Sequence, residues 1–137
     1  MTLVELVIVV VVVAILASIA VPGYRNHVLR TQRVEARTAL LDLAAAQEKF
    51  YLVHNTYATS QQLTAAPPDG LGLPATTGNG GYTITIADGA DATGFSAMAT
   101  AVGTQAADGD CATFTINQLG GKSATRSDGS ASKVCWY

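Results

Sequence analysis

The chain opens with MTLVELVIVVVVVAILASIAVPGY, residues 1–24, and this stretch decides how the rest is interpreted. Before Val21 the one charged residue is Glu5, and Val7–Val13 is an unbroken β-branched run. A helix of 21 residues spans about 32 Å, which matches a hydrocarbon core of about 30 Å. In lipid the backbone must form its hydrogen bonds internally, so even this β-branched run is held as helix. The stretch therefore predicts a membrane-spanning helix.

Two alternatives explain only part of this stretch. Ser18-Ile19-Ala20 resembles a signal-peptide cleavage site, but a secretory signal begins with basic residues, and here the leading residues carry an acid. An ordinary membrane anchor leaves Glu5 unexplained, because a carboxylate inside a membrane costs at least a few kcal/mol and needs a partner. Glu5 lies about 6 Å along the axis from residue 1. The α-amino group of residue 1 in another copy is the candidate partner.

Charge is scarce in this chain and is unevenly distributed. Of 137 residues, 49% are apolar and 13% are charged, and the net charge is −2. This composition excludes collagen-like, coiled-coil and wholly disordered chains, and it does not favour bulk binding of nucleic acid. Four arginines and one glutamate in residues 22–37 leave a net charge of +3. We expect this basic segment to lie where a membrane helix meets headgroups and water.

The first 24 residues closely resemble the mature N-terminus of type IV pilins, through the Thr2-Leu3-Val4-Glu5 start and through Pro22 and Tyr24. Two positions depart from the family pattern: Met1 stands where pilins have an N-methylated phenylalanine, and Ala14 stands where they have glycine. The resemblance implies that prepilin peptidase removes a short leader and that Met1 is the site of processing and methylation. It also implies that Met1 and Glu5 act in filament assembly.

We expect an α+β fold, in which a long N-terminal helix packs on a small antiparallel sheet, as in the ladle-like pilin fold. Residues 1–23 form the transmembrane or filament-core segment, and residues 24–137 form a periplasmic or extracellular globular domain. Pro22 and Gly23 are expected to break the helix, because proline has no backbone N–H to donate. An amphipathic helix over 24–53 and a loop over 54–81 follow. Alternating residues then predict four strands: Tyr82–Ala87, Phe95–Val102, Ala112–Asn117 and Lys133–Tyr137.

The amphipathic helix carries two apolar stripes at helical spacing. The first stripe is expected to pack on the sheet, and its members are Leu29, Ala36, Leu40, Leu43, Ala44, Gln47, Phe50 and Tyr51. The second stripe lies on another face and consists of Val34, Leu41, Ala45 and Leu52. A soluble monomer has no evident use for the second stripe, whereas a subunit whose helix packs against neighbours does. Scattered exposed apolar residues are the ordinary alternative.

Cys111 and Cys135 are the only two cysteines, and neither histidine lies at metal-ligand spacing from them. We interpret the pair as one disulfide formed in an oxidising compartment. Two buried free thiols are the alternative. The disulfide places the domain outside the cytoplasm, and leader charges absent from this sequence could set that orientation against the positive-inside rule.

The chain shows no motif that supports catalysis, and we expect no enzyme, no cofactor and no metal site. Residues 70–75 match a relaxed dinucleotide fingerprint, but they follow prolines rather than a strand, and so we interpret them as turns. Aspartates next to glycines are expected to cap turns, since no calcium loop with a closing glutamate is present. A calcium site there is the alternative.

One charged region supports a rival function. The segment bounded by the two cysteines contains Lys122, Arg126 and Lys133 against Asp128, a net charge of +2. Some pilins bind DNA through this region during uptake, so these three cations are the candidate DNA contacts, and a solvated loop is the alternative.

The sequence as a whole predicts a structural subunit of a type IV pilus, used for adhesion, twitching motility or DNA uptake. The subunit is stored in the inner membrane before assembly and then joins identical copies in a helical filament outside a Gram-negative cell. The pilus assembly machinery is an expected partner. A minor pilin that acts as a DNA receptor and a type II secretion pseudopilin are the alternatives.

Overall fold

The computed structural model describes residues 2–137, so the expectations for Met1 lie outside the described residues. The helix α1 covers Leu3–His54, and the strands are β1 (Tyr82–Ile86), β2 (Ser96–Ala101), β3 (Thr113–Asn117) and β4 (Lys122–Thr125). Short 3-10 turns cover Ser60–Gln62 and Gly103–Ala107. The chain divides into two compact units after Thr31, a short distance beyond the expected boundary at Gly23. The second unit begins where α1 first buries a side chain, at Gln32.

The helix α1 is continuous through Pro22 and Gly23, so the expected break is absent from the single chain. Proline has no backbone N–H, so the hydrogen bond from residue 22 to the carbonyl of Ser18 is absent. The hydrogen bonds on either side remain and hold the helical path through this position. The prediction of a break was therefore wrong for this state of the chain, and melting within a filament stays a prediction.

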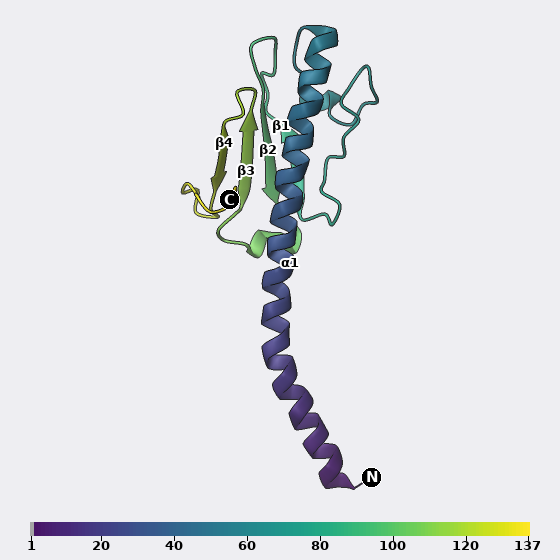
Figure 1. The fold of residues 1–137 in the computed structure, drawn as a ribbon, viewed down its shortest axis with the longest axis vertical. Helices are drawn as coiled ribbons and strands as arrows, with labels where there is room; N and C mark the ends of the chain where they lie inside the picture. Colours follow the sequence, from purple (N-terminus) through teal and green to yellow (C-terminus); the bar gives the residue numbers. More distant parts are fainter. Residues whose placement is uncertain (1) are drawn as a thin grey trace. The chain divides into compact units, whose positions relative to one another are not determined.

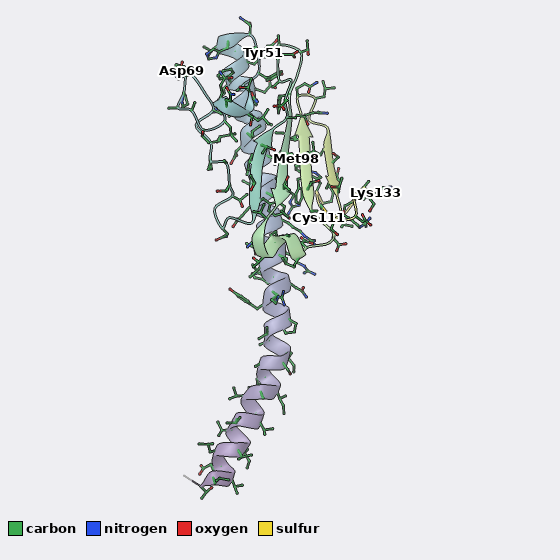
Figure 2. The ribbon with its side chains drawn as sticks, turned by 180° about the vertical axis from the view of Figure 1, so that it is seen from behind. Tyr51, Asp69, Met98, Cys111 and Lys133 are labelled. Carbon is green, nitrogen blue, oxygen red and sulfur yellow. A yellow bond between two sulfur atoms is a disulfide. The ribbon has the colours of Figure 1, made fainter. Side chains whose placement is uncertain are left out.

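The four strands form one antiparallel sheet in the order β1-β2-β3-β4 (Figure 1). The first three strands lie where the alternating patterns predicted them, and each of their ends is within two residues of the predicted end. The expected strand over 133–137 was wrong, because the fourth strand is Lys122–Thr125. In β4 only Ala124 is buried, so this short edge strand carries almost no apolar alternation in its sequence. The face of the sheet away from α1 carries Met98 (Figure 2).

The core of the second unit lies between the sheet and one face of α1. The buried residues of the helix are Gln32, Ala36, Leu40, Leu43, Gln47 and Phe50. The apolar residues among them belong to one hydrophobic cluster with inward-facing residues of the four strands, such as Ile84, Ala99, Phe114 and Ala124. The first apolar stripe is thus confirmed in its central members, while Leu29, Ala44 and Tyr51 are only half-buried. This cluster supplies the apolar burial that stabilises the unit.

A long connection between α1 and β1 is fastened to the helix by side chains. The buried Gln47 amide donates to the carbonyl of Ala58 at 2.9 Å and accepts from its N–H at 2.7 Å. Further along, Thr76 forms an isolated bridge with Thr83 at the edge of the sheet. Gly81 contacts Gln32 so closely that an added Cβ would lie 2.1 Å from its side-chain oxygen. The loop is therefore a positioned part of the fold.

Candidate assembly interface and C-terminal basic region

The apolar segment of α1 buries nothing within the described chain. Its large side chains from Leu3 to Val21 are between 49% and 81% exposed. This part of α1 is long and apolar enough to cross a membrane. A continuous apolar surface of this extent marks a membrane or protein interaction site.

The start of α1 reveals a contact that the sequence analysis missed. The hydroxyl of Thr2 accepts a hydrogen bond from the backbone N–H of Glu5 at 3.2 Å, so Thr2 caps the helix. A threonine followed three residues later by a glutamate is the capping-box pattern, which could have revealed this role. Glu5 also lies in the first turn of α1, where a negative charge interacts favourably with the helix dipole. Its side chain is exposed, so the carboxylate is accessible to a partner.

The second apolar stripe lies on the surface of the second unit. Val34 is 50% exposed, Leu41 46% and Leu52 83%, and Ala45 is exposed as well. The stripe therefore faces away from the core, as the helical spacing predicted. It adds unburied apolar area to the half of α1 that otherwise packs on the sheet.

The two cysteines are joined in one disulfide, Cys111–Cys135, which confirms the predicted pair. A buried network lies next to it: the Tyr82 hydroxyl donates to the carbonyl of Cys111 at 2.8 Å, and the Gln105 amide donates to Tyr82 at 3.2 Å. Burial raises the pKa of Tyr82 to about 12. These contacts fasten the disulfide-bounded region to the start of β1, an edge strand of the sheet.

Two of the four arginines in the basic segment have structural partners. Arg33 forms a bidentate pair with the buried Asp108, with both N–O distances at 2.5 Å. This hydrogen bond raises the pKa of the Arg33 guanidinium. Arg37 donates to the carbonyl of Trp136 at 3.3 Å. The membrane-flank interpretation therefore applies to Arg25 and Arg30, which are exposed and have no ion pair among residues 2–137.

The three candidate DNA contacts differ in their surroundings. Lys122 and Lys133 are exposed, and Lys133 lies on the C-terminal loop beyond β4 (Figure 2). The Lys122 ammonium lies 5.5 Å from the centre of the Trp136 ring. Arg126, in contrast, lies 3.7 Å from a carboxylate oxygen of Asp110 and donates to the carbonyl of Ala131. The structure thus leaves two cations exposed, one of them beside an aromatic ring.

Within residues 2–137 no three histidine, cysteine or acidic side chains gather at metal-binding distance.

The sequence model of one family matches residues 22–115, more than half of the chain, and that family is described as "Type IV minor pilin ComP, DNA uptake sequence receptor". The chain belongs to the type IV pilins. The match includes α1 from Pro22 onward and the first three strands, and it ends before Lys122.

Individual pilins resemble the chain over shorter regions. It is 33% identical over 90 residues to the type IV major pilin protein PilE1 of Neisseria gonorrhoeae. This match covers 64% of this chain and 39% of that protein. It is 37% identical over 70 residues to the type IV major pilin protein PilA of Myxococcus xanthus (strain DK1622). This match covers 50% of this chain and 32% of that protein. Each match thus spans less than two fifths of the relative.

A solved type IV pilin structure from Shewanella oneidensis shares the fold. Its TM-score is 0.50 at 24% sequence identity, and the match covers 69% of this chain and 89% of that one. The predicted class, one long N-terminal helix with a four-stranded antiparallel sheet, is therefore confirmed.

Proposed function

We propose that this pilin is a structural subunit of a type IV pilus. The observation that carries the proposal is the unburied apolar part of α1, from Leu3 to Val21, with Glu5 in its first turn. Lipid covers this surface while the subunit is stored in the inner membrane. Neighbouring copies replace the lipid when subunits assemble into an extracellular helical filament, and the role is structural rather than enzymatic.

The pairing of Glu5 with the amino group of another copy supports ordered assembly. A carboxylate in an apolar filament core is costly unless it is paired and hydrogen-bonded. Each incoming copy that supplies an amine to Glu5 therefore gains a favourable contact in one axial register only. Prepilin peptidase and the assembly machinery are the partners that this route requires.

The test is to shear filaments from the surface of cells that express the chain and to identify the subunit by mass spectrometry. We expect the chain in the sheared filaments, with an intact mass that also shows whether Met1 is methylated. Cells that lack the chain should lose those filaments if it is the main subunit, and should keep them if it is a minor one. Absence of the chain from every filament preparation would contradict the proposal.

A second candidate function is DNA reception by a minor pilin. It is favoured by the description of the matching family and by the exposed Lys122 and Lys133, with Trp136 beside Lys122. Two phosphate contacts give weak and salt-sensitive binding. Aromatic rings next to cations are also the groups on which unpaired bases stack.

Binding of duplex DNA to the full chain in detergent, measured across salt concentrations, tests this second function. Replacing both Lys122 and Lys133 by Gln should reduce the slope of log affinity against log salt by about 2. Arg126→Gln should have a smaller effect, because Asp110 already offsets that charge. Lys49→Gln, which removes an exposed cation from α1, is the matched control. No binding by the unaltered chain at low salt would exclude the DNA role.

A further inference from the structure

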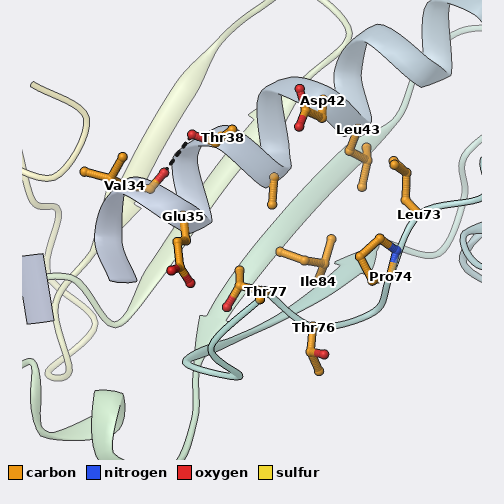
Figure 3. A pocket seen from close by; sticks show the side chains of 12 residues that line it. Val34, Glu35, Thr38, Asp42, Leu43, Leu73, Pro74, Thr76, Thr77 and Ile84 are labelled. Atoms are coloured by element: carbon orange, nitrogen blue, oxygen red, sulfur yellow. Dashed lines mark hydrogen bonds between the residues drawn. The ribbon is translucent and has the colours of Figure 1, made fainter. Parts of the chain in front are cut away.

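A groove runs along α1 in the second unit, between the helix and the loop over residues 73–78, and we refer to it as the loop groove. Its volume is about 390 Å³, and Leu43, Leu73 and Ile84 form its apolar floor. Figure 3 shows Leu73, Pro74 and Ile84 on the side opposite α1. An apolar groove of this size, left open between a helix and a loop, is suited to receive a side chain from another molecule.

The loop groove has an acidic rim. Glu35 and Asp42 line it from the α1 side, and none of its lining residues is a lysine, arginine or histidine. The Glu35 carboxylate accepts hydrogen bonds from the backbone and side chain of Asn79, so it is held in place. Asp42 is exposed and has no hydrogen bond or ion pair within the described part of the chain. The groove therefore combines an apolar floor with two carboxylates, and the carboxylate of Asp42 has no partner among the described residues.

The complementary chemistry occurs on the same chain, in the turns from Tyr24 to Arg30, which we refer to as the arginine turn. Tyr24 is 70% exposed, and Arg25 and Arg30 are exposed without an ion pair among residues 2–137. An arginine can lay its apolar stem along a hydrophobic surface while its guanidinium reaches a carboxylate. These residues lie where the membrane helix meets anionic headgroups, and they lose that counter-charge when a subunit leaves the bilayer.

Pairing within one chain is excluded by helix geometry. Arg30 and Asp42 are twelve residues apart on α1, which places them about 18 Å apart along the axis. An ion pair needs its nitrogen and oxygen within about 4 Å. A contact between these two residues must therefore join two copies of the chain.

We propose that the loop groove of one subunit receives the arginine turn of a second copy, with the guanidinium of Arg30 on Asp42. This inference rests on the proposed pilus function and names a subunit contact in addition to Glu5. Glu35 strengthens the negative potential at the rim, and the carboxylates take over the role of lipid phosphates. The contact favours assembly of subunits that have left the membrane.

Charge exchange tests the contact in cells that express the full chain. Arg30→Glu and Asp42→Arg should each reduce sheared filaments by about fivefold, because like charges then face each other. The double variant, which restores opposite charges, should recover filaments to near the original amount. Asp88→Arg, an exposed acid in the turn after β1, should assemble normally, and Arg30→Glu with Asp88→Arg should stay defective. Membrane levels and an oxidised Cys111–Cys135 pair show that each variant has folded.

Cysteine cross-linking gives a second readout. In filaments that carry both Arg30→Cys and Asp42→Cys, a bifunctional thiol reagent about as long as an arginine side chain should produce a ladder of linked subunits. The ladder must be intermolecular, because the two positions lie about 18 Å apart along α1 within one chain. Arg30→Cys with Asp88→Cys should give no ladder.

The outcomes separate this contact from the pilus function itself. Filaments of the unaltered chain with normal assembly of both single charge variants would overturn the contact while the pilus function stands. A ladder from Lys133→Cys with Asp42→Cys, and none from the Arg30 pair, would assign the groove to the C-terminal loop of another copy and likewise overturn the proposal. Absence of the unaltered chain from filaments would instead reject the proposed function.

Discussion

The two units of this pilin place apolar sequence in opposite environments. Before Pro22, α1 carries an almost uninterrupted apolar surface, and none of the described side chains before Thr31 is buried. From Gln32 onward the same helix buries a residue every three or four positions against a sheet. The second unit carries its own core, whereas in the proposed function the first obtains its apolar contacts from lipid or from other copies. Hydrophobic sequence is thus separable from folding stability in this chain, and the following changes test that separation.

The largest expected effect is at Glu5. Glu5→Ala should leave the subunit in the membrane and reduce filaments by at least about tenfold, because an incoming amine then meets no carboxylate. Filaments sheared from cells and quantified by immunoblot measure the effect. Since Glu5 also lies in the capped first turn of α1, Glu5→Gln separates the roles: it can keep a capping side chain but cannot form the ion pair. Normal piliation of Glu5→Ala would refute the pairing.

Matched truncations compare the two units directly. Leu40→Ala, at a fully buried position of the core, should lower the free energy of unfolding of the second unit by about 2–5 kcal/mol. Leu16→Ala, at a position 62% exposed, should leave that unfolding unchanged. Thermal unfolding of the detergent-solubilised chain, followed by near-ultraviolet circular dichroism, measures both. Equal losses for the two variants would show that the units are not independent in stability.

The disulfide should act on the second unit alone. Replacing both Cys111 and Cys135 by Ser should lower its free energy of unfolding by about 3 kcal/mol, given a separation of 24 residues in the chain-entropy treatment. The helicity contributed by residues 3–21 in detergent should not change. Denaturant titration gives the first quantity and far-ultraviolet circular dichroism the second. Unchanged stability of the double variant would show that the buried network, not the covalent link, fastens this region.

Tyr82 predicts a smaller, pH-dependent effect on the same unit. Burial raises its pKa to about 12 in the folded chain, above the ordinary value of 10. Its contribution to stability is therefore complete below pH 10 and is lost as the pH rises toward 12, since the unfolded chain releases the proton first. Tyr82→Phe should remove this alkaline loss. At neutral pH the substitution should lower the free energy of unfolding by about 1–3 kcal/mol, because the carbonyl of Cys111 loses its hydrogen-bond donor.

Unfolding midpoints between pH 7 and pH 12 for the original and Tyr82→Phe chains measure both quantities. Parallel pH curves for the two chains would show that Tyr82 does not ionise on unfolding. Tyr57→Phe, which removes an exposed hydroxyl bonded to Glu48, is the matched control for loss of a phenol at the surface.

The first unit should change conformation on assembly. We expect α1 to melt locally in the filament between Ala14 and Pro22, where proline removes a donor and Gly23 adds flexibility. Ala14, in place of the glycine usual in the family, should keep the melted stretch short, since alanine favours helix by about 1 kcal/mol. Hydrogen exchange of intact filaments should then be fast only in this stretch, and uniform protection from residue 3 through Tyr24 would contradict the prediction.

Much of this architecture could be predicted because it depends on local pattern. The apolar run before Val21, the alternation in the first three strands and the two stripes of α1 each follow from periodicity along the chain. The strand Lys122–Thr125 escaped prediction because it buries only Ala124, and its position is set by pairing with β3.

The remaining features depend on contacts between distant residues. Arg33 was expected to face headgroups with its neighbours, yet it pairs with Asp108, a contact across 75 residues that no local pattern indicates. The expectation of a break at Pro22 overestimated the effect of losing one hydrogen bond in an otherwise intact helix. The cap by Thr2 was visible in the sequence, since the capping-box spacing was present. The loop groove required the folded loop to be placed beside α1 before its acidic rim could be seen.

A map of the sheared filament at side-chain resolution tests the central claim most directly, namely that residues 3–21 exchange lipid for neighbouring copies of the chain. We predict that these side chains are buried among the helices of other subunits and that each Glu5 carboxylate lies within hydrogen-bond distance of the N-terminal amine of another copy. A filament in which residues 3–21 make no contact between subunits, or in which Glu5 faces solvent, would contradict the claim.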